Sequence, residues 1–212
     1  MFFKTGAGSY GSHDKFLGVK VPAVRKIVNT YYKSLSLEEI QTLISSEFNE
    51  ERLFALLVLV KLYNKDPEKI YNFYIDNIHY VNNWNLVDLS ARPIVGAYFA
   101  DKKDKSYLLD LAKSKNLWER RIAIVSTWFF IAKCKKLNYT FEIAKMLFQD
   151  KEDLIHKATG WMLREAGKVD APQLKLFLDE NTQHMPRTML RYSIEKFTDE
   201  DRKYYMTKPR AK

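Results

Sequence analysis

The sequence predicts an all-α protein, on three observations. Apolar residues recur at three- and four-residue intervals along most of the chain, the spacing that gives a helix one apolar face; Leu53, Leu56, Leu57 and Val60 are an example. No segment alternates apolar and polar residues as a half-buried strand would. The 212 residues include only seven glycines and six prolines, too few for a loop-rich β fold. A hydrophobic content of 46% favours a folded core over disorder.

The spacing of the predicted helices indicates a repeat. Helices that open new pairs are expected near residues 21, 49, 84, 116, 153 and 185, at intervals of 28 to 37 residues. This period fits stacked helical pairs of the HEAT type, and about eleven short helices are expected. The chain is therefore predicted to form a single domain over residues 1–212, a right-handed α-solenoid (α-α superhelix) with a concave, basic groove. Because the self-similarity of the repeats is weak, an ordinary multi-helix bundle is the alternative.

Local signals place several helix starts. Ser36 followed by Glu39 is a capping box, in which each residue bonds the other's backbone N–H. Asp66 before Pro67 combines an N-cap acid with a proline suited to the first helical turn. Asp170, two residues before a proline, is interpreted in the same way.

Two other prolines shape the prediction. Pro22 is expected to open a helix that runs to about Lys33. Pro93 lies inside the apolar run of residues 86–99, where it removes a backbone hydrogen bond. The helix is therefore expected to bend about one turn beyond Asp88.

The net charge of +9 is unevenly distributed. Residues 1–36 contain six Lys or Arg and one Asp, and residues 113–136 contain seven Lys or Arg and one Glu. Residues 37–112 contain eight basic and twelve acidic residues. Two basic zones around an acidic one favour a surface that binds a polyanion such as nucleic acid. A generally basic protein with no such partner is the simpler interpretation.

The single cysteine, Cys134, excludes an intramolecular disulfide, suits a reducing compartment, and is expected to be buried. The N-terminus has no signal-peptide pattern. The longest apolar run, residues 122–132, is too short to span a bilayer. A cytoplasmic protein that does not enter the membrane is expected.

Three apolar helical runs carry the residues that could form a site. Trp84 and Asp88 are four residues apart and therefore share a helix face. Arg121 opens the second run, and Trp161 lies within the third. A carboxylate, a guanidinium and aromatic rings on successive helices suggest a site for a planar, anionic partner. Each residue also has a structural alternative: Asp88 could pair with Arg92 at the surface, the tryptophans could be core, and Arg121 could anchor a helix.

Five motifs, in this order, carry a resemblance to a known family: Phe2-Phe-Lys-Thr-Gly6, the segment from Tyr10 to Pro22, Asn83-Trp-Asn-Leu-Val-Asp88, Trp118-Glu-Arg-Arg-Ile-Ala-Ile124, and Lys157-Ala-Thr-Gly-Trp-Met-Leu-Arg-Glu165. The chain resembles the AlkD-like DNA alkylation repair glycosylases over nearly its whole length. Any one motif alone would be weak, but together they are specific.

The resemblance implies a HEAT-like solenoid that holds damaged duplex DNA and hydrolyses the N-glycosidic bond of purines alkylated at N3 or N7, without flipping the base. Asp88 would stabilise oxocarbenium character on the deoxyribose and orient the attacking water. Trp84 and Trp161 would cradle the sugar and phosphate. Arg121 would hold a backbone phosphate, and Tyr10 matches a family position near the lesion.

Arg120, next to Arg121, and Lys157 are further DNA-binding candidates. The four histidines are scattered and match no ligand spacing, so no metal or other cofactor is expected. The enzyme is expected to act as a monomer on duplex DNA that contains alkylated purines. Longer family members have an extra helix before the first motif, so the first repeat here is expected to be incomplete.

Two other functions stay open. A non-catalytic HEAT-repeat scaffold could bind DNA or protein with the same fold. Asp88 argues against it, because a carboxylate facing phosphates repels them. A nuclease is disfavoured because no acidic cluster suited to metal ions is visible.

Overall fold

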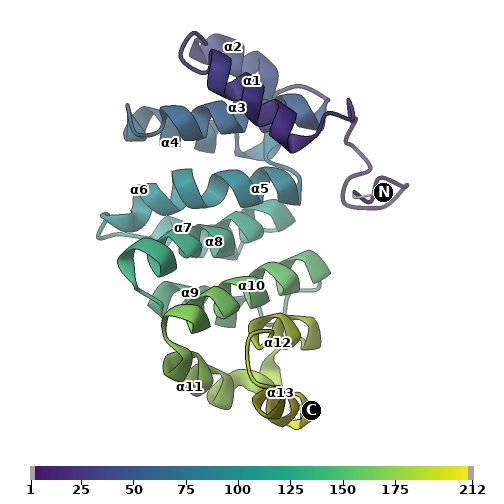
Figure 1. Ribbon diagram of the computed structural model, residues 1–212, viewed down its shortest axis with the longest axis vertical. Helices are drawn as coiled ribbons and strands as arrows, with labels where there is room; N and C mark the ends of the chain where they lie inside the picture. The colour runs from purple at the N-terminus through teal and green to yellow at the C-terminus, as the bar shows by residue number, and fades with distance from the viewer. Residues whose placement is uncertain (1–2, 210–212) are drawn as a thin grey trace. The chain divides into compact units, whose positions relative to one another are not determined.

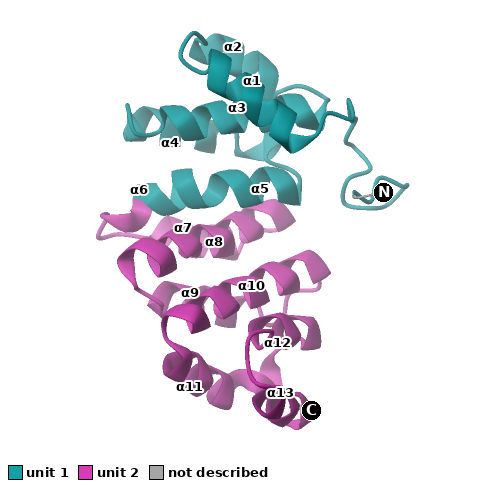
Figure 2. Ribbon diagram, viewed as in Figure 1, with its two compact units in different colours: residues 1–98 teal, residues 99–212 magenta. Residues whose placement is uncertain are grey.

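The computed structural model describes residues 3–209. In this range the regular elements are helices, and the β pairing is limited to one isolated bridge between Lys15 and Phe48. The chain divides into two compact units, residues 1–98 and 99–212 (Figure 2). Within the described residues, no helix is both long enough and apolar enough to cross a membrane. Phe2, in the first of the five motifs, lies outside the described residues.

Unit 1 begins with a non-helical segment, residues 3–20, and continues as helices (Figure 1). Helix α3 packs against α1, α2 and α5, so its apolar side chains form the centre of this unit. Leu53, Leu56 and Leu59 on α3 are almost completely buried. The helices are α1 (Val21–Tyr31), α2 (Leu37–Ile44), α3 (Asn49–Leu62), α4 (Pro67–Asp76), the 3₁₀ turn η1 (Ile78–Tyr80), α5 (Trp84–Ser90) and the π-helical turn η2 (Ala91–Gly96).

Unit 2 follows α6 (Ala97–Ala100), which crosses the boundary between the units. Helix α10 packs against α8, α9, α11 and α12. Its Leu163 belongs to a buried apolar cluster with Leu174, Leu178 and Leu190. The helices are α7 (Ser106–Ala112), α8 (Leu117–Phe129), the π-helical turn η3 (Phe130–Cys134), α9 (Asn138–Met146), α10 (Asp153–Val169), α11 (Ala171–Asn181), the 3₁₀ turn η4 (Thr182–His184), α12 (Arg187–Ser193) and α13 (Asp199–Thr207).

The predicted all-helical class is confirmed, and so are the starts of the six pair-opening helices. Helices α1, α3, α5, α8, α10 and α12 begin within two residues of the expected positions. The capping box of Ser36 and Glu39 is present, with the Ser36 N–H donating to Glu39 at 2.8 Å. Asp66 and Asp170 accept from the backbone N–H groups of Lys69 and Gln173, as N-caps do.

The bend predicted at Pro93 stays a prediction, and the burial predicted for Cys134 is wrong. The stretch around Pro93 is a π-helical turn, in which the N–H of Ala97 donates to the carbonyl of Arg92, five residues earlier. The proline therefore lies in a widened turn that contains an extra residue. Cys134 is only partly buried, because it ends η3 and is followed by Lys135, which has a left-handed backbone (φ 55°).

Candidate nucleic-acid interface

Helix α5 presents Trp84 and Asp88 on its less buried face. The helix begins at Trp84 because Asn83 has an extended backbone, and its carbonyl accepts from the N–H groups of residues 86 and 87 at 3.1 Å. Leu86 and Val87 are completely buried. Trp84 and Asp88 are half-buried and lie one turn apart. The predicted sharing of a helix face by these two side chains therefore agrees with the burial pattern of α5.

The N-terminal segment fixes the ring of Trp84. Its indole Nε1–H donates to the hydroxyl of Tyr10 at 3.1 Å. Phe3 stacks on the indole with ring centroids 5.2 Å apart, and also on Phe16 with centroids 4.7 Å apart. The segment thus brings together Tyr10 and Trp84, two residues that the family motifs singled out. The contact of Phe3 was not predicted, although the first motif contains it.

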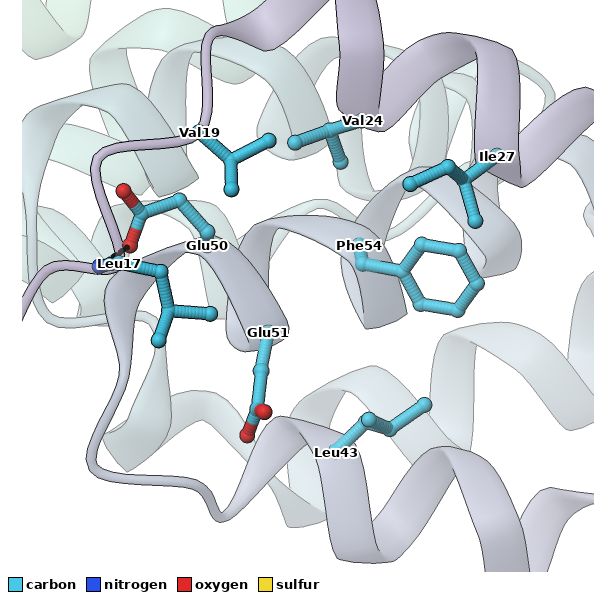
Figure 3. A pocket seen from close by; sticks show the side chains of 8 residues that line it. All are labelled: Leu17, Val19, Val24, Ile27, Leu43, Glu50, Glu51 and Phe54. Atoms are coloured by element: carbon cyan, nitrogen blue, oxygen red, sulfur yellow. Dashed lines mark hydrogen bonds between the residues drawn. The ribbon is translucent and has the colours of Figure 1, made fainter.

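The N-terminal segment is in turn bound to the first turn of α3. The Glu50 carboxylate accepts from the backbone N–H of Leu17 at 3.0 Å and of Gly18 at 2.9 Å. Figure 3 shows this carboxylate directed at the backbone of Leu17, with Val19 beside it. The Asn49 N–H donates to the carbonyl of Lys15 at 2.8 Å. These bonds hold the non-helical N-terminal segment against α3.

In unit 2, Arg121 connects two helices. It lies on α8, its residue surface is 5% exposed, and its Nη1 donates to the carbonyl of Leu154 in the first turn of α10. Leu154, Lys157 and Trp161 follow one another at helical spacing on α10. The guanidinium of Arg121 is therefore anchored at the end of α10 that also carries Lys157. This contact agrees with the structural alternative stated for Arg121, and it leaves the phosphate-binding role as a proposal.

Arg120 makes several contacts inside unit 2. Its Nε and Nη2 donate to the two carboxylate oxygens of Asp150, at 2.6 and 3.3 Å. Its Nη1 donates to the carbonyls of Ser114 and Lys115, at 2.9 and 3.0 Å. A bidentate ion pair between a guanidinium and a carboxylate is strong and directional. Arg120 thus fixes the turn before α8 to the turn before α10, a role that the sequence did not indicate.

Lys157 lies at the surface of α10. Its Nζ is 2.6 Å from the Asp153 carboxylate, one turn earlier, and both side chains are largely exposed. The hydrogen bond from Lys157 lowers the pKa of Asp153 below its ordinary value. A partner with phosphate groups would compete with Asp153 for this ammonium group.

Trp161 is half-buried and packs edge-on against Trp128 of α8, with ring centroids 5.0 Å apart and an interplanar angle of 64°. Gly160, the preceding residue, lets α12 approach closely: a Cβ there would be 2.4 Å from the carbonyl oxygen of Met189. The predicted packing role of Trp118 is confirmed, because only 8% of this residue is exposed. Trp128 also has the predicted packing role, and the residue against which it packs, Trp161, is itself a candidate site residue.

Within each unit, then, the structure groups the predicted residues. Unit 1 places Tyr10 on Trp84, with Asp88 one turn along α5. Unit 2 joins α8 and α10 through Arg121 and through the ring of Trp161, and Lys157 lies between these contacts at the surface of α10. Among residues 3–209, no group of three His, Cys, Asp or Glu side chains is arranged to hold a metal ion.

Comparison with known proteins decides the family. The model of the family described as DNA alkylation repair enzyme matches residues 2–197. The chain belongs to this family. A solved structure described as a predicted DNA alkylation repair enzyme from Enterococcus faecalis is similar to it, with a TM-score of 0.72 and 14% sequence identity over 90% of this chain and 92% of that one. At this identity the likeness concerns the fold alone. No curated protein matches the chain.

The family predicted from the five motifs is therefore confirmed. The DNA alkylation repair family implies DNA as the partner, in agreement with the expectation drawn from the basic zones. The match ends at residue 197, so it covers all the residues singled out in both units.

Proposed function

We propose that this member of the DNA alkylation repair family is a monofunctional glycosylase that hydrolyses the N-glycosidic bond of N3- and N7-alkylated purines in duplex DNA. The observation that carries the proposal is the pair on α5: a half-buried carboxylate, Asp88, one turn from an indole, Trp84, whose ring is oriented by Tyr10. A scaffold would gain nothing from a carboxylate directed at phosphates. An enzyme that develops positive charge on a sugar gains from a carboxylate beside that sugar, because the negative charge stabilises the transition state.

The reaction suits these residues. A purine alkylated at N3 or N7 carries a formal positive charge, so the bond between its nitrogen and C1′ breaks with the electron pair leaving on the base. The base needs no proton to leave. Asp88 stabilises the positive charge that develops on the deoxyribose. It also orients the water that attacks C1′ and takes up the proton that this water loses as the hydroxyl group forms on the sugar. The indole face of Trp84 lies against the cationic sugar.

The groups of unit 2 are proposed to hold the DNA backbone. Trp161 would lie against the sugar-phosphate, and Arg121 and Lys157 would face phosphates, with Arg120 next to them. Because such contacts replace counterions, DNA affinity should fall steeply with salt. The proposal includes the finer architecture as well: HEAT-like pairs in a right-handed solenoid with a basic concave groove, acting as a monomer in the cytoplasm and without base flipping.

The test is release of free N7-methylguanine and N3-methyladenine from methylated duplex DNA by the wild-type protein and by Asp88→Asn. The substitution keeps the shape of the side chain and removes its charge, so we expect release to slow by about 10²-fold or more. Asp76→Asn, an exposed acid on α4, is the matched control and should be as active as wild type.

Failure of the wild type to release either base under excess enzyme, with DNA binding intact, would instead favour the non-catalytic scaffold. Asp88→Asn should then bind DNA more tightly, because a carboxylate that repels phosphates has been removed.

A further inference from the structure

We infer that Asp14 is a positioning residue that holds Trp84 and the start of α5 in the geometry required for catalysis. This inference rests on the proposed function, in which Trp84 and Asp88 act on the deoxyribose. Asp14 lies in the N-terminal segment, four residues after Tyr10, and it is not among the residues that the family motifs assign to the site.

The Asp14 carboxylate is the centre of a buried polar cluster. Its side chain has no solvent exposure, and it pairs with the Arg52 guanidinium, whose side chain is 3% exposed. It also accepts from Nδ2 of Asn49 at 3.1 Å and from Nδ2 of Asn83 at 2.5 Å. The donors come from two other parts of the unit: α3 supplies Arg52 and Asn49, and the residue before α5 supplies Asn83.

A buried ion pair contributes little to stability compared with apolar residues of similar size, because both charges lose their hydration. Its effect on geometry is different. A carboxylate that accepts from three donors in two separate parts of the fold satisfies all of them in one arrangement only. The cluster is therefore suited to fixing where α5 begins.

The residues on both sides of Trp84 are tied to this cluster. Asn83 is the N-cap of α5, but its side chain makes no capping bond and donates to Asp14 instead. Asn85 donates to Oδ1 of Asn49 at 2.7 Å and accepts from its Nδ2 at 3.4 Å. The backbone of Trp84 is thus held from both neighbours.

The same segment holds the ring of Trp84 through the Tyr10 hydroxyl. Gly11 allows the two contacts to coexist, because a Cβ there would lie 2.9 Å from the Lys4 carbonyl oxygen and 3.5 Å from Nδ2 of Asn83. The segment between Tyr10 and Asp14 therefore fixes Trp84 in two ways. Tyr10 bonds the indole ring, and Asp14 bonds Asn83, the residue before Trp84 in the chain. Loss of the Asp14 contact should let the indole and the following turn, with Asp88, move relative to the substrate.

The experiment compares wild type with Asn83→Ala and Asp14→Asn by three measurements. The first is the single-turnover rate of alkylpurine release, and the second is the affinity for methylated duplex DNA. The third is the ¹H–¹⁵N resonance of the Trp84 indole, assigned by its loss in Trp84→Phe. Asn83→Ala is the milder variant, because the pair of Asp14 and Arg52 survives in it; it keeps the test valid if Asp14→Asn fails to fold.

Tyr74→Phe is the matched control. It removes a buried hydrogen bond to Ser90, at the other end of α5, where the Tyr74 hydroxyl lies 3.1 Å from Oγ of Ser90. It therefore loosens the same helix without touching the N-terminal segment. The Trp84 indole resonance and the release rate should stay at their wild-type values in this variant.

We expect Asn83→Ala to shift the Trp84 indole resonance and to slow release by on the order of 10- to 100-fold, because small misplacements of catalytic groups are costly. DNA affinity should change by less than about threefold, so that the loss is in the chemical step. A folded Asn83→Ala variant with wild-type rate, or with an unmoved indole resonance, would overturn the inference. If the wild type releases no base but the resonance still shifts, the proposed function has failed and the positioning of Trp84 stands.

Discussion

The two units hold their candidate residues by different kinds of contact. In unit 1, Trp84 is held by hydrogen bonds and ring stacking from a non-helical segment, which is itself bound through buried polar groups. In unit 2, Trp161 lies on a 17-residue helix that packs directly against its neighbours, with Gly160 at a close contact to α12. In unit 1 the position of the tryptophan depends on which polar groups surround it. In unit 2 it depends on the volume of the side chains at the contacts between helices.

Because of this difference, the two units should be destabilised by different kinds of substitution. A polar cluster is damaged by the loss of one partner, because the remaining groups stay buried without compensation. A packed helix pair tolerates changes of charge at its surface but not an added atom at its contact point. Matched substitutions in each unit test this difference.

The largest effect is expected at Arg52. Arg52→Ala leaves the buried Asp14 carboxylate without its cationic partner and should lower the free energy of unfolding by about 3–5 kcal/mol. Urea denaturation measures the loss. Arg202→Ala, which breaks an exposed pair with Asp199, is the control and should cost less than about 1 kcal/mol. Equal losses in the two variants would mean that the buried pair contributes no more to the free energy of unfolding than an exposed pair does.

An intermediate effect is expected at Gly160. A methyl group there meets the backbone of Met189, which cannot move aside without shifting α12, so Gly160→Ala should lower stability by about 1–3 kcal/mol. Gly167→Ala, on the same helix, is the control: its methyl group meets only the end of the Leu174 side chain at 2.4 Å. That variant should lose less stability than Gly160→Ala, because the end of a leucine side chain can rotate away whereas a backbone carbonyl cannot, and both variants gain the same helix propensity. Thermal or urea unfolding that ranks the two the other way would contradict the packing argument.

The smallest effect is expected at Lys157. Lys157→Gln removes the hydrogen bond that lowers the pKa of Asp153, so this pKa should rise toward its ordinary value, as an NMR titration can follow. The pair's stabilisation is present above the ordinary pKa of Asp and is lost as the pH falls through the lowered one. Since both side chains are largely exposed, the loss of stability near neutral pH should stay below about 0.5 kcal/mol.

The same variant tests the DNA contact. If Lys157 faces a phosphate, the salt dependence of DNA affinity should decrease by about one counterion. An unchanged slope would assign Lys157 to its pair with Asp153 alone.

Helix starts were predictable because their signals are local. Ser36, Asp66 and Asp170 each bond a backbone N–H three residues ahead, and the sequence shows both members of each pattern. The placing of Tyr10 on Trp84 was not derivable in this way, since 74 residues separate them. Only the family resemblance named both.

The Asp14 cluster was missed altogether. In the sequence Asp14 is one acid in a basic zone, and nothing local shows that it is buried or that Arg52 and Asn83 converge on it. Arg120 was misleading for a similar reason. Its partner, Asp150, lies 30 residues away, so adjacency to Arg121 was the only available signal.

The π-helical turn after α5 has a consequence for how the sequence can vary. A π turn takes up one residue more than an α-helical turn, so the residues on either side of it face as they would in a regular helix one residue shorter. The turn over Ala91–Gly96 therefore absorbs an extra residue without changing the direction of α5 relative to the residues that follow. Removing one residue from this turn should restore a regular helix and leave Trp84 and Asp88 facing as they do now. Removing one residue between Asp88 and Ala91 without loss of the π turn should instead rotate both side chains by about 100°.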